Sequence, residues 1–230
     1  RRPPRSTLFP YTTLFRSLDV GCGDGASTGF CADRGAHIIL TDIDPAKVTQ
    51  LAQRLAASPA RAVESFVSDA NPLPLEAEIA NKIICTEVLE HVDDPKVVMA
   101  ELVRVGKPGA LYLLTVPDPA AEKLQLDLAP PQYFAKPNHI RIFERDEFQR
   151  LVEDAGLVIE RRTSYGFYWA LWWLLFWQTD SSIADAAKSK SLDAWTRTWS
   201  ATLDGKDGLR IKRALDDLMP KSQAIVARKP

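Results

Sequence analysis

Three glycines within five residues, Gly21, Gly23 and Gly25, follow directly on the short apolar run that ends at Val20. Because glycine has no Cβ, it lets the backbone turn tightly and approach a ligand closely, so the pattern predicts a strand, a ligand-binding turn and then a helix. An acid, Asp42, ends the next apolar run. A carboxylate at that place can accept hydrogen bonds from ribose hydroxyls. The spacing therefore predicts a nucleoside cofactor site at the carboxyl ends of neighbouring strands.

Short apolar runs alternate with helical patterns along the rest of the chain. The expected strands after the first cover residues 37–41, 63–67, 82–85, 111–116, 157–161 and 223–227. The expected helices cover residues 26–34, 95–105, 145–155 and 208–218, with another that starts at Asp44-Pro45 and buries Val48, Leu51 and Leu55. A turn over residues 106–109 ends the helix at 95–105. This alternation predicts a parallel sheet wrapped by helices.

Composition limits the class of protein. With 230 residues, of which 46% are hydrophobic and 26% charged, the chain can bury one core and carry one appendage. A net charge of -1 argues against a nucleic-acid backbone as the main partner, so no DNA binding is expected. The three cysteines, Cys22, Cys31 and Cys85, have no metal-ligand spacing. We expect them to be reduced, buried thiols in a cytoplasmic protein.

The first seventeen residues need separate treatment. Residues 7–17 read TLFPYTTLFRS, which resembles the translation of a sequencing-adapter oligonucleotide. We therefore expect residues 1–17 to be a non-native leader and exclude them from fold reasoning.

Asp19 lies inside the first expected strand, two residues before Gly21. A buried acid at this place would repel a pyrophosphate but can orient a cationic amino group. Further landmarks follow in order: Asp42, the turn Ser68-Asp69-Ala70, EVLEHV at 87–92, KPGA at 107–110 and NHIRIF at 138–143. From residue 18 to about residue 148 the chain thus resembles class I S-adenosylmethionine-dependent methyltransferases, and its EVLEHV motif is similar to that of ubiquinone-pathway O-methyltransferases.

The resemblance implies a Rossmann-like α/β fold with a doubly wound, seven-stranded, mostly parallel sheet whose final strand is antiparallel. We expect the cofactor-binding core at residues 18–162, a helical, aromatic-rich cap inserted at 163–220, and the final strand of the core at 221–230.

The resemblance also implies roles for individual residues. S-adenosylmethionine would contact Asp19, Gly21, Gly23, Gly25, Asp42, Ile43, Asp69, Ala70 and Glu87. In this set Asp19 and the first two glycines would line the methionyl part, Asp42 would hold the ribose, and Asp69 with Ala70 would meet the adenine. Glu87 would face the methyl group. The expected catalytic residues are Glu87 and His91, the latter as the base for an oxygen or nitrogen acceptor.

A metal site is an alternative use of the same segment. Glu87, Glu90 and His91 are spaced i, i+3 and i+4, so a helical turn would put them on one side, and His139 could complete the set. Such ligands suit Mg²⁺ or Mn²⁺, and they resemble the metal site of small-RNA 2'-O-methyltransferases. We favour the metal-free interpretation, in which Glu90 caps a turn and His91 packs or lines the acceptor pocket.

Residues 165–177, YGFYWALWWLLFW, form the second informative stretch. Thirteen residues are too few to span a bilayer, which needs about twenty. Three interpretations stay open: a lid over an apolar acceptor pocket, a helix in the core or in a homodimer interface, and a helix in weak contact with a membrane.

We therefore expect methyl transfer from S-adenosylmethionine to a small, largely apolar or aromatic acceptor, at oxygen. One alternative is a metal-assisted 2'-O-methyltransferase that acts on RNA ends. Another is a nicotinamide-dependent oxidoreductase, because Gly21-x-Gly23-x-x-Ala26 also satisfies the relaxed dinucleotide pattern. A non-catalytic cofactor-binding module is the third.

Overall fold

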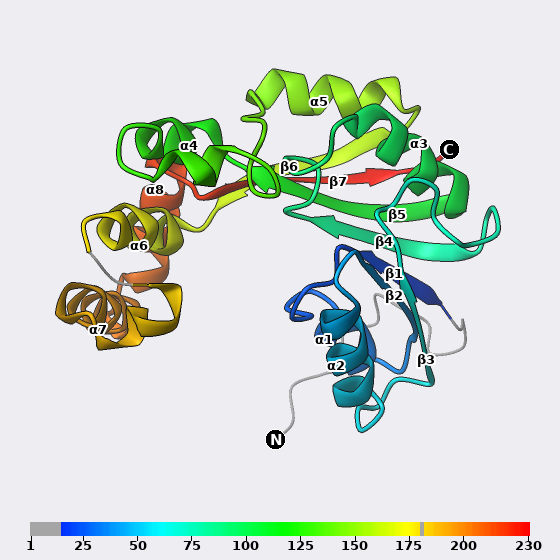
Figure 1. Ribbon diagram of the computed structural model, residues 1–230, viewed down its shortest axis with the longest axis horizontal. Coiled ribbons are helices and arrows are strands. Elements are labelled where there is room, and N and C mark those ends of the chain that lie inside the picture. The colour runs from blue at the N-terminus through cyan, green and yellow to red at the C-terminus, as the bar shows by residue number, and fades with distance from the viewer. Residues whose placement is uncertain (1–14, 180–181) are drawn as a thin grey trace.

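The computed structural model describes residues 15–179 and 182–230, so most of the expected leader lies outside the described residues. Its centre is a seven-stranded sheet in the order β3-β2-β1-β4-β5-β7-β6 (Figure 1). The strands are β1 (Arg16–Val20), β2 (His37–Asp42), β3 (Ala62–Val67), β4 (Ala80–Thr86), β5 (Gly106–Pro117), β6 (Val158–Tyr165) and β7 (Ser222–Arg228). The pairs among β1 to β5 are parallel, whereas β7 runs antiparallel to both β5 and β6. The expected fold class, including the antiparallel final strand, is confirmed.

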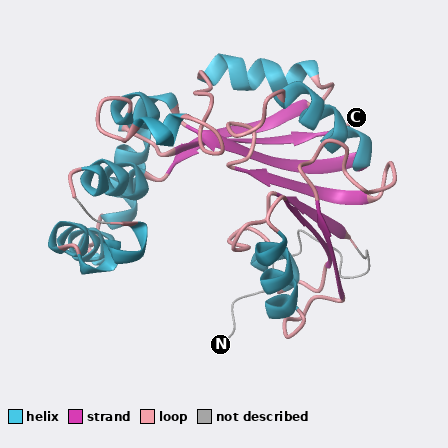
Figure 2. Cartoon of the chain, viewed as in Figure 1, coloured by secondary structure: helices cyan, strands magenta, loops and turns pink. Residues whose placement is uncertain are grey.

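The helices fall on both faces of the sheet and beyond the ends of its strands (Figure 2). They are α1 (Gly29–Ala32), α2 (Pro45–Leu55), α3 (Pro95–Val105), α4 (Pro119–Gln125), α5 (Arg145–Asp154), α6 (Phe167–Trp177), α7 (Lys190–Asp204) and α8 (Gly208–Leu218), with short 3₁₀ turns at η1 (Pro131–Phe134) and η2 (Ile183–Lys188). Apolar side chains of α3 and α5 cover one face in the main core, and those of α1 and α2 cover the other in a second cluster. Parallel strands place their carboxyl ends at one edge, so the loops after β1, β2, β4 and β5 meet there.

Helix α2 follows its sequence signals closely. The Asp44 carboxylate accepts a hydrogen bond from the Ala46 N–H at 2.8 Å and so caps the helix, which begins at Pro45. Val48, Leu51 and Leu55 are buried, as the period of the pattern predicts.

The expected bounds of the first helix and the expected turn at residues 106–109 were wrong, and the first strand begins earlier than expected. Helix α1 covers Gly29–Ala32 rather than residues 26–34, because the glycine turn continues as far as Thr28, whose hydroxyl bonds to Asp19. Residues 106–109 lie within β5 rather than in a turn, since Gly106 pairs with Ala80 of β4. Strand β1 begins at Arg16, inside the segment expected to be foreign.

Helices α6, α7 and α8 lie between β6 and β7 in the chain. The eleven residues of α6 are apolar on every face, yet only Ala170 and Phe176 are fully buried, and Trp169 is 52% exposed. No helix in the described part of the chain is long and apolar enough to cross a membrane.

Candidate functional site

The loop after β1 passes very close to the loop after β4. Gly21 has a φ of +68°, and a Cβ on it would lie 2.3 Å from Val88 Cγ2 in the EVLEHV segment. A larger residue at position 21 would therefore push the two loops apart. This contact places the glycine turn beside the segment that carries Glu87, Glu90 and His91.

Asp42 organises the same loop from the end of β2. Its Oδ2 accepts a hydrogen bond from the Gly23 N–H at 2.8 Å, and its Oδ1 accepts one from the Asp44 N–H at 3.0 Å. Each carboxylate oxygen has a second lone pair, so both can still accept hydrogen bonds from a ribose. A Cβ on Gly23 would meet nothing within 4 Å, so this side of the turn is open to a ligand.

Asp19 is 2% exposed and unusually placed for an acid. Its Oδ2 accepts a hydrogen bond from the Thr28 hydroxyl, whereas its Oδ1 has no partner among the described residues. Burial, helped by the negative charge of Asp42 and opposed by Thr28, raises the pKa of Asp19 to about 7. An unpartnered buried oxygen needs a donor, and a cationic amino group at the loop would supply one. The residues at this loop therefore fit the amino end of S-adenosylmethionine.

The remaining predicted cofactor contacts lie after β2, at Ile43, and after β3, at Asp69 and Ala70, the two residues expected to meet the adenine. Ile43 is 71% exposed next to Asp42, so its side chain offers an apolar surface. The Asp69 carboxylate accepts a hydrogen bond from the Asn71 N–H at 3.0 Å, as expected for a turn-forming residue. Ala70 is buried, with a φ of +66°.

The structure does not bring Glu87 into the cluster that the spacing predicted. Glu87 has a φ of +57°, so no helical turn forms there. Its carboxylate instead accepts a hydrogen bond from the Thr115 hydroxyl at 2.9 Å and pairs with Lys221, the residue just before β7. Burial lowers the pKa of Lys221, but its contact with Glu87 outweighs this, and the pKa is raised. Glu87 therefore joins β4, β5 and β7 at the edge of the sheet.

Glu90, His91 and His139 do come together. One potential ligand atom from each lies within 4.8 Å of the others, and the two imidazole rings are 5.0 Å apart. A hydrogen bond from the Ile140 N–H to the Glu90 carbonyl, 3.0 Å long, ties the NHIRIF segment to EVLEHV. Of the four residues considered for the metal alternative, three thus lie together, whereas Glu87 does not.

The electrostatics of this group are unusual. Both Glu90 side-chain oxygens are buried and have no hydrogen-bond partner among the described residues. Burial, together with the nearby Glu87, raises the pKa of Glu90 well above its usual range. Burial and then the charge of His139 lower the pKa of His91, whose Nδ1 lies 3.1 Å from the Pro137 carbonyl oxygen. His91 is therefore neutral at pH 7, with an unprotonated Nε2 that lies 3.8 Å from Glu90 Oε1.

An aromatic wall borders the two histidines. Tyr133 lies 4.7 Å from the His139 ring and 5.1 Å from Trp177 of α6, with Trp173 at 6.1 Å. The apolar run that the sequence singled out thus reaches the histidine pair through Tyr133.

Sequence reasoning missed Glu122 of α4 and Lys221. Glu122 is 1% exposed and lies 2.9 Å from His139 Nδ1. Lys221 meets Glu87 across 134 residues of sequence. No periodic pattern signals either contact.

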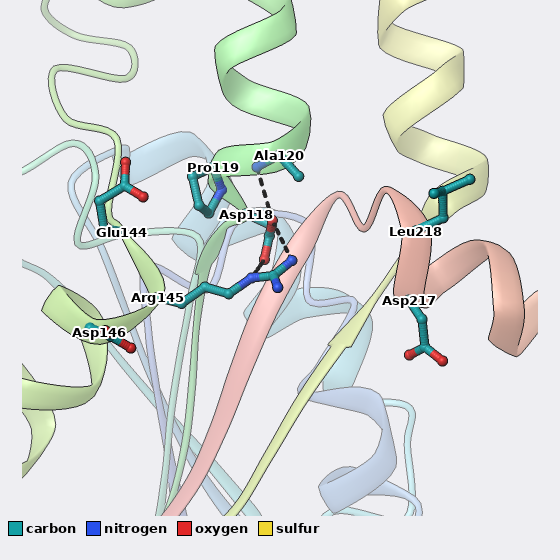
Figure 3. Close-up of a pocket in the computed structure, with 8 residues that line it drawn as sticks. All are labelled: Asp118, Pro119, Ala120, Glu144, Arg145, Asp146, Asp217 and Leu218. Carbon is teal, nitrogen blue, oxygen red and sulfur yellow. Dashed lines mark hydrogen bonds and ion pairs between the residues drawn. The ribbon is translucent and has the colours of Figure 1, made fainter.

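A separate polar pocket lies where α4, α5 and α8 meet (Figure 3). In it the Arg145 guanidinium points at the buried Asp118 carboxylate and donates two hydrogen bonds of 2.8 and 3.0 Å. The pocket contains none of the predicted site residues. Its ion pair instead joins the start of α5 to the start of α4.

Comparison with known proteins relates residues 18–114 to the family described as methyltransferase domain. A ubiquinone biosynthesis O-methyltransferase from Hahella chejuensis is 36% identical over 107 residues, which cover 44% of this chain and 43% of that protein. The chain thus matches less than half the length of this curated relative.

Solved structures share the fold over nearly the whole chain. An S-adenosylmethionine-dependent methyltransferase from Mesorhizobium loti aligns with a TM-score of 0.59 at 15% identity, over 96% of this chain and 94% of that chain. The [4+2]-cyclase SpnF aligns with a TM-score of 0.61 at 18% identity, over 94% of this chain and 74% of that chain. These likenesses concern the fold alone, and a fold can support different reactions.

Proposed function

Because residues 18–114 form a class I S-adenosylmethionine-dependent methyltransferase domain, similar to ubiquinone-pathway O-methyltransferases, we propose that the protein methylates an oxygen of a small, largely apolar or aromatic acceptor. One observation carries the proposal. His91, which is neutral, belongs to the loop that contacts Gly21, and its neighbour His139 packs against Tyr133, which contacts α6. A hydroxyl on an aromatic ring would there meet a proton acceptor and an apolar surface together.

When bound, S-adenosylmethionine supplies a methyl group already activated on a sulfonium, so the chain mainly has to bind, orient and exclude water. Asp42 would accept hydrogen bonds from the ribose, and the free Oδ1 of Asp19 would hold the amino end. An oxygen acceptor must lose a proton as the methyl bond forms. His91 is the candidate base, because its lowered pKa leaves Nε2 unprotonated at neutral pH.

A divalent ion at Glu90, His91 and His139 is a second candidate. It is supported by the two unpartnered Glu90 oxygens and by the bonding of both imidazoles. His91 Nδ1 lies against the Pro137 carbonyl and His139 Nδ1 against the Glu122 carboxylate, which leaves each Nε2 available. Histidine ligands of metals commonly bond in this way through the second nitrogen. Such an ion would lower the pKa of a bound hydroxyl.

Calorimetry and product analysis test the activity. We expect S-adenosylhomocysteine to bind and NAD not to bind. Phenols and catechols with apolar side chains should then yield O-methyl products detectable by mass spectrometry. Binding of NAD without binding of S-adenosylhomocysteine would contradict the proposal, and methylation of a short RNA at a 2'-hydroxyl instead would favour the RNA-end alternative.

Chelation tests the metal. If the ion takes part, turnover should be lost in excess EDTA and return with Mn²⁺. Glu101→Gln, which alters an ion pair on α3, is a control that should leave metal dependence unchanged. Full turnover in excess EDTA would leave His91 as the base without a metal.

A further inference from the structure

Glu122 of α4 is a buried acid in direct contact with His139. Its side chain is 1% exposed, and three donors surround its carboxyl group. His139 Nδ1 lies 2.9 Å from Oε2, while Gln125 Nε2 and the Tyr133 hydroxyl lie 3.1 and 3.5 Å from Oε1. A buried carboxyl group surrounded in this way acts as an acceptor on both oxygens.

The direction of these hydrogen bonds is set from α6. The indole Nε1–H of Trp177 donates to Gln125 Oε1 at 2.8 Å. An indole nitrogen can only donate, so the Gln125 amide must turn its oxygen to Trp177 and its Nε2 to Glu122. The amide of Gln125 thus has one orientation. Its Nε2 donates to Glu122 Oε1, which leaves Oε2 as the oxygen that His139 contacts.

The contact with Glu122 determines which ring nitrogen of neutral His139 carries the proton. Because Glu122 accepts on Oε2, the neutral His139 ring carries its proton on Nδ1. Its Nε2 is then left with a lone pair. His139 is only 11% exposed in its side chain, and its ring is held between Tyr133 at 4.7 Å and His91 at 5.0 Å.

We propose that Glu122 is a positioning residue that holds His139 as the Nδ1-protonated tautomer, with its Nε2 lone pair available to the acceptor hydroxyl. Trp177 supports this arrangement by orienting Gln125, so α6 contributes to the chemistry of the site as well as to its apolar wall. The proposal rests on the proposed function only for the identity of the group that meets Nε2. The tautomer itself is a property of the protein alone.

Nitrogen NMR of the histidine rings tests the tautomer in the free protein. The chain has three histidines, so long-range ¹H–¹⁵N spectra can be assigned by comparison with His91→Gln and His37→Gln variants. In the wild type we expect His139 to show a protonated Nδ1 and an unprotonated Nε2. In Glu122→Gln, whose amide can also donate, the tautomer ratio should shift toward Nε2–H by roughly tenfold or more, the scale of one hydrogen bond to a charged group.

Two further variants sharpen the result. Trp177→Phe keeps an aromatic ring but loses the indole donor, so we expect a smaller shift in the same direction. Glu101→Gln, which removes a carboxylate bonded to Arg104 on α3, is the matched control and should leave His139 unchanged.

A wild-type His139 with its proton on Nε2 would overturn the proposal whatever the variants do. An unchanged tautomer in a folded Glu122→Gln variant would also overturn it. Because these spectra need neither cofactor nor acceptor, loss of the proposed function would appear separately, as a failure of S-adenosylhomocysteine to bind.

Discussion

At the scale of single residues, Asp42 combines two tasks. It accepts hydrogen bonds from the Gly23 and Asp44 N–H groups and so shapes the turn, and its remaining lone pairs face the predicted ribose site. Asp42→Asn keeps the size of the side chain and one of its two acceptor oxygens, so it disturbs the turn less than truncation does.

We therefore predict that Asp42→Asn weakens binding of S-adenosylhomocysteine by about 1–3 kcal/mol, the scale of hydrogen bonds to a charged group. Calorimetry measures the change. The matched control is Asp44→Ala, which removes the cap of α2 and should cost about 1 kcal/mol of folding free energy with little effect on affinity. Equal affinity of the Asp42→Asn and wild-type proteins would rule out the ribose assignment.

Asp19 provides a prediction about pH. Its pKa is raised from 3.8 to about 7, so in the free protein the side chain is mostly protonated at pH 6 and mostly ionised at pH 8. The ionised form attracts the cationic amino group of S-adenosylhomocysteine. Affinity should therefore rise with pH through about 7, and at pH 6 it should be about tenfold below its plateau.

The same shift acts on folding with the opposite sense. Because the pKa of Asp19 is higher in the folded state, the folded protein holds this proton at pH values where the unfolded chain has lost it. The free energy of unfolding of the free protein should therefore decrease as the pH rises from about 4 to about 7. Asp19→Asn should remove both trends in calorimetry and urea unfolding. A pH-independent affinity in the wild type would show that Asp19 does not meet the amino group.

At the scale of elements, α8 holds the start of α6. The Asp216 carboxylate accepts hydrogen bonds from the Gly166 and Phe167 N–H groups at 3.0 and 2.9 Å, and it pairs with Lys212. Gly166 itself has a φ of +94° and no side chain to cap the helix. The cap of α6 therefore comes from a residue fifty positions later in the chain.

Asp216→Ala should lower the free energy of unfolding by about 1–2 kcal/mol, as for the loss of an N-terminal helix cap. Urea unfolding measures this loss. The adjacent Asp217→Ala is the control, because Asp217 is exposed and should change stability by less than about 0.5 kcal/mol. If both variants were equally stable, the hydrogen bonds from Asp216 to the start of α6 would not contribute to the free energy of unfolding.

Helices α2 and α1 differ in how well the sequence predicted them. Helix α2 was predictable because its signals are local: Asp44 caps it, Pro45 starts it, and its apolar residues recur at helical spacing. Helix α1 was not, because its start depends on a bond between Thr28 and Asp19 that links a turn to a strand. Local propensity gives way where a side chain makes a tertiary hydrogen bond.

At the scale of the whole molecule, the seven-stranded sheet with its antiparallel final strand was predictable from the family resemblance, but the side-chain partners beyond the strand ends were not. Glu87 was expected beside His91, yet its backbone turn directs it to Lys221, from the far end of the chain. Glu122 of α4 contacts His139, 17 positions later in the chain. Such contacts depend on how distant segments meet, which spacing along the chain does not encode.

The molecule divides the two tasks of the proposed reaction between regions of the sheet. The loops after β1, β2, β3 and β4 carry the predicted cofactor contacts, whereas α6, α7 and α8 follow β6 and lie beyond the strand ends (Figure 1). Binding of S-adenosylhomocysteine alone should therefore stabilise the loops with the predicted cofactor contacts and leave α7 and α8 largely unchanged.

Hydrogen exchange with and without S-adenosylhomocysteine tests this division. At a ligand concentration 100 times its dissociation constant, any opening that destroys the site should cost about 2.7 kcal/mol more, which slows exchange about a hundredfold. We expect this protection in residues 21–25, 42–46 and 87–91, and little in α7 and α8. The Asp42→Asn variant at the same ligand concentration should lose most of the effect. Protection concentrated in α6, α7 and α8 would instead show that the nucleoside binds against these helices, and would contradict the assignment of cofactor binding to the loops after the strands.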